Sequence, residues 1–307
     1  MEAFFKNKSI IDMINRWKIH LILITIISSA IGVFISSPIV MVPKYKSTAI
    51  VYPVNIYAYS KESTSEQMLQ VFNSNDIKEK MLAAFNLANH YKLDKKDPQF
   101  YTYFLGEYSD NVSISKTEFE SIEIKVLDTD PKTASNMVDS LITFYDNKTA
   151  EMHRKKQLEV ITISTNQFNI KIKELDSLEK LLSNIRQTYG IMNYTSQVTE
   201  ATKGELSGNN AAKELFKKLQ LHGVEYQKLD SMVFNIRKEY LFNKYTLETA
   251  EKEYNKKISY SQVVSSPYPA DKKSYPVRWA VVAITVITSL IFSLIVIALI
   301  DSKRKKA

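Results

Sequence analysis

The chain has no cysteine, and its 307 residues include only 6 glycines and 4 histidines. Without cysteine there is no disulfide bond, no thiol nucleophile and no Cys-ligated zinc site. No GxxxxGK[ST] loop occurs, which excludes a P-loop nucleotide site. The histidines (His20, His90, His153 and His222) form no HExxH pattern and have no acid-rich partner motif. We therefore expect no catalytic residues, no metal and no cofactor.

Charged residues are absent from two long stretches. Residues 19–42 contain no Asp, Glu, Lys or Arg, and residues 279–300 contain neither charge nor histidine. As a helix rising ~1.5 Å per residue, either stretch crosses a hydrocarbon core of about 30 Å. We predict transmembrane helices over 19–42 and 279–300. A cleaved signal peptide ending near Ser28-Ser29-Ala30 is the less favoured alternative, because the apolar run continues well beyond Ala30.

Basic residues flank these two stretches on their outer sides. Lys6, Lys8, Arg16 and Lys18 precede the first, and Lys303, Arg304, Lys305 and Lys306 follow the second. Because positive flanks stay in the cytoplasm, tails 1–18 and 301–307 are predicted to be cytoplasmic and residues 43–277 to be exported. The net charge of +8 is then mostly a topology signal, and we expect no nucleic-acid partner.

The exported region has both strand and helix patterns. Residues 45–54 are rich in Thr, Ile, Val and Tyr, and residues 111–128 alternate apolar and polar, as in a hairpin or two adjacent strands. Residues 64–94 have helical spacing with a break at 73–76. The segment SQVVSSPYP, from residue 261, resumes strand-like character and is expected to pair with 45–54.

Two long helices are predicted over about 131–189 and 211–256. Asp130 and Pro131 are a favourable helix start, and no Gly or Pro follows before Gly190. Between the helices, residues 190–210 hold three of the six glycines and are expected to form a turn. Heptad spacing predicts a seam between the helices. Its members are Ile161, Phe168, Leu175, Leu182, Leu219, Tyr226, Val233 and Tyr240. His222 occupies the same seam, where a buried polar group sets register.

A proline-rich segment, 266–276, stands directly before the second apolar stretch. It holds Pro267, Pro269 and Pro276, followed by Arg278. Proline restricts its own φ, lacks an N–H and biases the preceding residue to extended structure. We expect a stiff spacer that prevents the second long helix from running on into the membrane.

This layout resembles the bacterial polysaccharide co-polymerases, the Wzz-type chain-length determinants. The proline/basic segment, the sequence DTDPKTASNMVDSLITFYDN from residue 128 and the opening RWKIHLILIT followed by PKYKSTAIVYP carry the resemblance. It implies an α+β membrane protein with two terminal transmembrane helices. Between them, residues 43–277 would form a membrane-proximal periplasmic domain with a long, coiled-coil-like helical protrusion.

The resemblance also implies a function and partners. The protein would be a non-enzymatic, multi-pass inner-membrane regulator of the chain length of a surface polysaccharide, such as the lipopolysaccharide O-antigen. Its partners would be its own copies in a ring-like homo-oligomer, an integral-membrane polymerase, a growing lipid-linked glycan and the lipid bilayer. The alternative is a membrane adaptor of a capsule or exopolysaccharide export system that works with a separate tyrosine kinase. A sensor or a secretion-pump adaptor is disfavoured by the short tail 301–307 and the scarcity of glycine.

Overall fold

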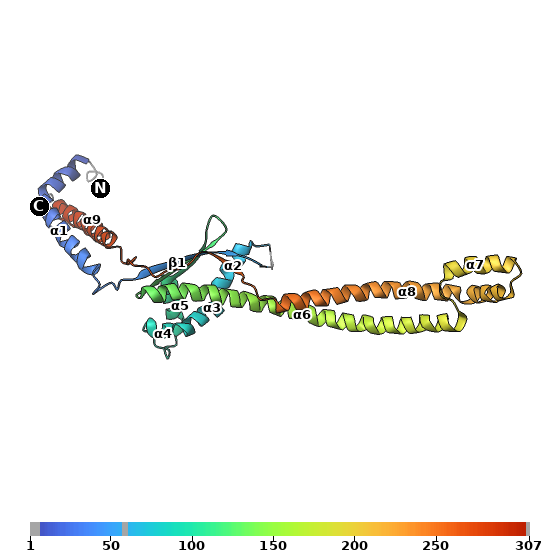
Figure 1. Ribbon diagram of the computed structural model, residues 1–307. Helices are drawn as coiled ribbons and strands as arrows, with labels where there is room; N and C mark the ends of the chain where they lie inside the picture. Colours follow the sequence, from blue (N-terminus) through green and yellow to red (C-terminus); the bar gives the residue numbers. More distant parts are fainter. Residues whose placement is uncertain (1–6, 57–60, 305–307) are drawn as a thin grey trace. The chain divides into compact units, whose positions relative to one another are not determined.

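The computed structural model describes residues 7–56 and 61–304 (Figure 1). The chain divides into two compact units. The first unit is formed by Met1–Lys148 together with Ser259–Ala307, and the second by Thr149–Ile258. Helices predominate and one sheet is present, so the fold class is α+β with apolar terminal helices and long central helices, as predicted.

The sheet of the first unit has four antiparallel strands in the order β2-β3-β1-β4. The strands are β1 (Tyr45–Pro53), β2 (Val112–Lys116), β3 (Ile122–Asp128) and β4 (Ser261–Ser265). β2 and β3 form the predicted hairpin. β1 lies between β3 and β4, with Ala49 opposite Ile124 and Tyr52 opposite Gln262. The expected pairing of the segment after the long helices with residues 45–54 is therefore present.

Strand alternation explains which face of the sheet is buried. In β3 every second residue is buried, and Ile122, Ile124 and Val126 are wholly inaccessible. Their β-branched side chains suit a pleated surface with one packed face. In β1 the corresponding inward positions are Ala49 and Val51. These apolar positions build the core of the first unit.

Among the residues described between β1 and β2 there are four helices: α2 (Thr64–Phe72), α3 (Asn75–Ala84), α4 (Leu87–His90) and α5 (Phe100–Asn111). α2 begins with a capping box in which Ser63 and Glu66 satisfy each other's backbone N–H. The break between α2 and α3 falls inside the predicted interval 73–76. Phe72 stacks on Tyr145 of α6 (Pro131–Tyr189) with ring centroids 4.6 Å apart, which fixes the start of that long helix on the core.

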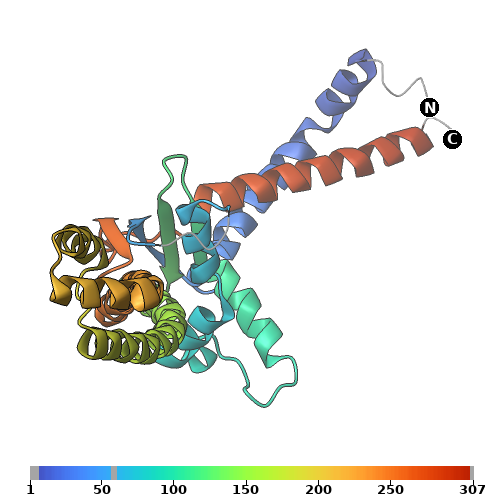
Figure 2. The ribbon, with the colours of Figure 1, turned by 90° about the vertical axis from the view of Figure 1, so that its right-hand side faces the viewer.

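The apolar terminal helices are α1 (Asn7–Ile35) and α9 (Arg278–Arg304), which cross each other (Figure 2). By length and composition, Met13–Ile35 and Arg278–Ile300 are able to cross a membrane. The first span was predicted over 19–42, but the helix ends at Ile35 and residues 36–41 form turns. Pro38 explains the difference, because it disfavours helical conformation in Ser37 and donates no N–H.

Close packing of α1 on α9 occurs at Gly32. A Cβ atom there would lie 3.0 Å from the Cα atom of Val282, so only glycine allows this approach without movement of α9. Ser28 and Ser36, one turn on either side of Gly32, are also buried. Small residues four apart let helix backbones approach in a membrane, where packing replaces the hydrophobic effect as the main attraction.

The second unit contains the later part of α6, α7 (Tyr194–Leu206) and α8 (Asn210–Asn255). The long helices have nearly the expected bounds, but the expectation that residues 190–210 form only a turn is wrong. Asn193 caps α7 by accepting a hydrogen bond from the N–H of Ser196. Gly204 does not break this helix, because it packs against Ala212, whose Cβ would be 2.5 Å from an added Cβ.

The chain between α8 and α9 corrects the expected role of the prolines. α8 ends at Asn255, and β4 lies between that helix and Pro267. Pro267, Pro269 and Pro276 therefore do not stop α8, which has already ended before the chain joins the sheet.

Candidate functional site

The segments next to α1 and α9 are joined by backbone hydrogen bonds, and we call this the span junction (residues 44 and 274–278). The N–H of Lys44 donates to the carbonyl of Tyr275 at 3.1 Å, and the carbonyl of Lys44 accepts from Ser274 at 2.9 Å. Pro276 is buried, and its peptide bond with Tyr275 is cis. Arg278 is the first residue of α9. The junction thus ties the segments that lead to both apolar helices together directly before β1.

The proline-rich segment is attached to the same sheet one step further along. The Ser47 hydroxyl of β1 donates to the carbonyl of Tyr268 at 3.1 Å. Pro267 is half-buried and Pro269 is exposed on either side of that contact. Of the four residues predicted as a proline/basic motif, the structure brings Pro276 and Arg278 to the span junction and places Pro267 and Pro269 along β1.

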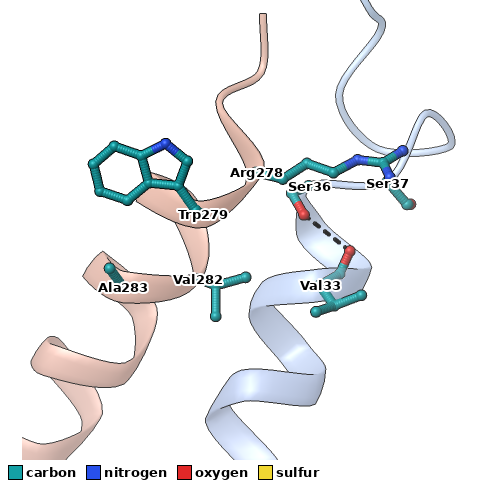
Figure 3. Close-up of a pocket in the computed structure, with 7 residues that line it drawn as sticks. All are labelled: Val33, Ser36, Ser37, Arg278, Trp279, Val282 and Ala283. Carbon is teal, nitrogen blue, oxygen red and sulfur yellow. Dashed lines mark hydrogen bonds between the residues drawn. The ribbon is translucent and has the colours of Figure 1, made fainter.

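A cavity of about 520 Å³ lies between the adjoining ends of α1 and α9. Figure 3 shows its lining residues: Val33, Ser36, Ser37, Arg278, Trp279, Val282 and Ala283. The side chain of Arg278 extends from α9 toward Ser37, just after the end of α1, and the indole of Trp279 points away from α1. The Ser36 hydroxyl donates a hydrogen bond to the carbonyl of Val33 at 3.1 Å. The cavity therefore combines apolar walls with one cationic side chain.

A buried polar cluster lies at the end of β3. Asp128 is 3% exposed and its Oδ2 lies 2.6 Å from Nε2 of His90, while its Oδ1 accepts from the N–H of Asp130 at 2.9 Å. Burial raises the pKa of the nearby Tyr91 hydroxyl, and the charge of Asp128 raises it further. Asp128 thus joins α4, β3 and the start of α6.

Asp128 is not among the site residues predicted from the sequence. A signal was present, because Asp128 continues the inward positions Ile122, Ile124 and Val126 of β3. A carboxylate on the buried face of a strand needs partners, so that position predicts a polar cluster. His90 comes from α4, and no local pattern indicates that this helix packs beside the end of β3.

The predicted helix seam lies within the second unit. Leu182 of α6 and Leu219, Tyr226 and Val233 of α8 are buried in one cluster, with Leu175 packed against it. Phe168 stacks on Tyr240 with centroids 5.2 Å apart. Ile161 is half-buried. Within this unit, the part of α6 from Thr149 onward lies beside α8 (Figure 1).

Two polar contacts fix the register of the seam. The ring of His222 stacks on Tyr189 with centroids 3.6 Å apart. The Tyr226 hydroxyl donates to the carbonyl of Met192 at 2.6 Å, which holds the connection between α6 and α7. Around the seam, Arg237 pairs with Glu179 at 2.5 Å. Among the described side chains, those of residues 13–56 and 61–300, no three His, Asp or Glu residues are grouped as metal ligands.

In comparisons with known proteins, no family model and no curated protein matches the chain. Solved structures that it resembles include a full-length bacterial polysaccharide co-polymerase, at 12% identity and a TM-score of 0.42, covering 96% of this chain and 97% of that one. A fragment of WzzB, a polysaccharide co-polymerase from Salmonella Typhimurium, is 13% identical with a TM-score of 0.33, covering 76% of this chain and all of the fragment. The wild-type Shigella flexneri lipopolysaccharide O-antigen chain-length regulator is 13% identical with a TM-score of 0.31, covering 75% of this chain and 100% of that one. These structures are of the class that the sequence resemblance indicated.

Proposed function

We propose that the protein is a non-enzymatic regulator of surface polysaccharide chain length in a bacterial inner membrane. In this proposal α1 and α9 span the membrane, both chain ends are cytoplasmic, and residues 43–277 lie in the periplasm. The protein works as a homo-oligomer beside an integral-membrane polymerase that extends a lipid-linked glycan.

The span junction is the observation that carries this proposal. Lys44 and Tyr275 place the two apolar helices beside each other, and β1 pairs with β4 immediately beyond. A protein that sets glycan length without catalysing a reaction must hold its membrane helices and its exported surface in a fixed geometry. Hydrogen bonds between the two connecting segments supply such a link, because neither segment is a free tether.

A second observation supports self-association. The outward face of α8 carries exposed apolar side chains, including Leu221 and Val224, which are 67% and 72% exposed. At helical spacing they lie opposite Leu219 and Tyr226, which fill the seam. Since the seam already occupies the inward face, this outward face is available to a second copy of the chain.

The proposed oligomer is tested by mass measurement of the full chain in lipid nanodiscs. Wild type is expected to be larger than a dimer, and Leu221→Glu with Val224→Glu is expected to shift the mass toward the monomer. A matched control is Gln220→Glu with Gln227→Glu, which adds the same charge at exposed flanking positions of α8. A monomeric wild type, or equal effects of both pairs, would contradict the proposed association.

The proposed function is tested by the length distribution of surface polysaccharide on gels. Host cells that lack the protein are expected to show a ladder without a preferred length, and wild type at normal expression restores the preferred length. The double variant Leu221→Glu with Val224→Glu should broaden the ladder, whereas the control Gln220→Glu with Gln227→Glu should not. An unchanged ladder in cells without the protein would overturn the proposal.

A further inference from the structure

The cavity between the adjoining ends of α1 and α9 has properties of a ligand site. Its volume of about 520 Å³ falls within the range of roughly 300–1,000 Å³ typical of small-ligand pockets. Val33, Val282 and Ala283 form apolar walls that continue the membrane-crossing faces of the two helices. Because the cavity sits where both spans end, it lies at the boundary between hydrocarbon and water. Lipid chains and lipid headgroups meet at that boundary.

Two polar groups in the cavity have no partner in the described part of the chain. Ser37 Oγ is shielded from solvent and bonds to no described residue. Arg278 forms no ion pair with the described side chains of residues 13–56 and 61–300, although it extends across the cavity toward Ser37 (Figure 3). A guanidinium is a strong donor to phosphate oxygens, and a serine hydroxyl donates to the same oxygens. At the start of α9 the N–H groups of Ala280 and Val281 donate to the carbonyl of Val277, whereas the N–H groups of Arg278 and Trp279 precede the first acceptor of the helix and add positive potential at the same end.

The charges flanking the cavity favour an anion. No Asp or Glu occurs in residues 13–61 or in residues 272–300. These two segments instead contribute Lys44, Lys46, Lys272 and Lys273 close in sequence to the span ends. Asp271 is the one acid in the proline-rich segment. A negative ligand at Arg278 would therefore meet attraction from both connecting segments and little repulsion.

We propose that this cavity binds the phosphate group of an anionic phospholipid from the surrounding bilayer. Arg278 and Ser37 contact the phosphate, and the acyl chains lie along the apolar walls toward Val282 and Ala283. Trp279 suits the headgroup level, where indole rings are enriched. The inference requires only that α1 and α9 span a membrane. It does not depend on any role in glycan length.

The test is native mass spectrometry of the full chain in a mild detergent with added short-chain lipids. Phosphatidylglycerol, with net charge −1, is expected to bind saturably, at least about tenfold more tightly than zwitterionic phosphatidylcholine. Arg278→Gln should weaken phosphatidylglycerol binding about tenfold, since charge-assisted hydrogen bonds are lost. Lys273→Gln removes the same charge from the same segment outside the cavity lining. Because the attraction of Lys273 acts at longer range and is screened by salt, this change should weaken binding by less than about twofold.

Further variants separate the site from general surface charge. Arg278→Lys should retain part of the affinity, because the charge stays while the bidentate geometry is lost. Ala283→Trp should block binding by filling the cavity with every charge in place. If Arg278→Gln does not fold, as judged by circular dichroism, these two variants still decide the question.

Several outcomes would overturn the proposal. Equal losses of phosphatidylglycerol affinity in Arg278→Gln and Lys273→Gln would show that only general surface charge matters. Unchanged affinity in Ala283→Trp would exclude the cavity as the binding site. Equal affinity for phosphatidylcholine would remove the requirement for an anion. Tenfold preference for a polyisoprenyl phosphate would assign the site to a different lipid. Saturable binding of inorganic phosphate alone, lost in Arg278→Gln, would make it a free-anion site.

Discussion

The backbone of Lys44 is hydrogen-bonded in both directions to Tyr275, with its N–H 3.1 Å from the Tyr275 carbonyl and its own carbonyl 3.2 Å from the Tyr275 N–H. Lys44 follows α1 and Tyr275 precedes α9. A single pair of residues therefore fixes the spacing of the two apolar helices where they leave the sheet. The local geometry is that of an antiparallel bridge, in which facing Cα atoms lie ~5.5 Å apart.

That geometry predicts a disulfide between cysteines placed at the two positions. Lys44→Cys with Tyr275→Cys should cross-link within one chain on mild oxidation, because a Cα separation of ~5.5 Å suits a disulfide. The natural chain has no cysteine, so no background reaction competes. Non-reducing gels of membranes should show a monomer of altered mobility in the double variant and in neither single variant. Cross-linked dimers in place of that monomer would contradict the bridge.

Asp128 is expected to be a strong stability determinant. Asp128→Ala removes the partner of His90 and the acceptor of the Asp130 N–H, and we expect a loss of about 3 kcal/mol in the free energy of unfolding. Asp130→Ala removes the exposed cap of α6 and should cost only about 1 kcal/mol. Thermal unfolding followed by circular dichroism in detergent measures both. Equal losses would show that Asp128 acts only as a cap.

The second unit is expected to lose stability in mild acid through His153. Burial and the nearby Lys156 lower the pKa of His153 below its usual value of about 6.5, while Glu253 opposes the shift. Protonation therefore favours the unfolded chain. The stabilisation is complete above pH ~6.5 and is lost as pH falls below that value toward the folded-state pKa.

Thermal melts of wild type and His153→Gln at pH 7.5 and 5.5 check this sign. Wild type should lose more stability between the two pH values than the variant, and the difference isolates His153 from His90 and His222. An equal drop in both proteins would assign the acid sensitivity to other groups.

The long helices were predictable because their signals are local and repeated. From Asp130 to Gly190 no Gly or Pro interrupts the chain beyond Pro131 at the helix start, and seven-residue spacing marks the seam. β4 was predictable from its β-branched composition. The glycines of residues 190–210 predict a turn in place of α7 because glycine commonly interrupts helices, whereas Gly204 meets a specific packing requirement against Ala212. Such a requirement depends on a neighbouring helix, which composition does not reveal.

The candidate site was predictable only in part, for a similar reason. The prolines and Arg278 identify the segment before α9, but the bridge from Tyr275 to Lys44 involves one residue on each side and has no pattern. The cavity likewise depends on how α1 ends. Pro38 and Ser37 set that end, and the apolar run by itself predicts a helix through Val42.

Two glycine substitutions should have opposite effects on stability. Gly204→Ala introduces a Cβ 2.5 Å from that of Ala212 and must push α7 from α8, so we expect a net loss of about 1–2 kcal/mol. Gly106→Ala in α5 meets no atom within 4 Å and should stabilise by about 0.5–1 kcal/mol through better helix propensity. Denaturant unfolding of both variants in one detergent provides the comparison. A stabilising Gly204→Ala would mean that α7 does not pack on α8 as described.

Pro276 is expected to matter more than Pro267 and Pro269 for the geometry of the span junction. Pro276 is buried at the span junction and restricts Tyr275 to extended conformations, the conformation that the bridge to Lys44 requires. Pro276→Ala should relax that restriction and let α9 begin earlier, which would break the bridge. Pro267→Ala with Pro269→Ala alters exposed or half-buried positions along β1, and β4 still separates α8 from α9.

We therefore expect Pro276→Ala to slow the cross-link between Cys residues at positions 44 and 275 and, under the proposed function, to broaden the polysaccharide ladder. The Pro267/Pro269 double variant should leave both nearly unchanged at equal expression. If the double variant broadens the ladder while Pro276→Ala does not, the contact of the segment with β1, through Tyr268 and Ser47, would be the important one. A slower cross-link with a normal ladder would instead separate the geometry of the junction from control of glycan length.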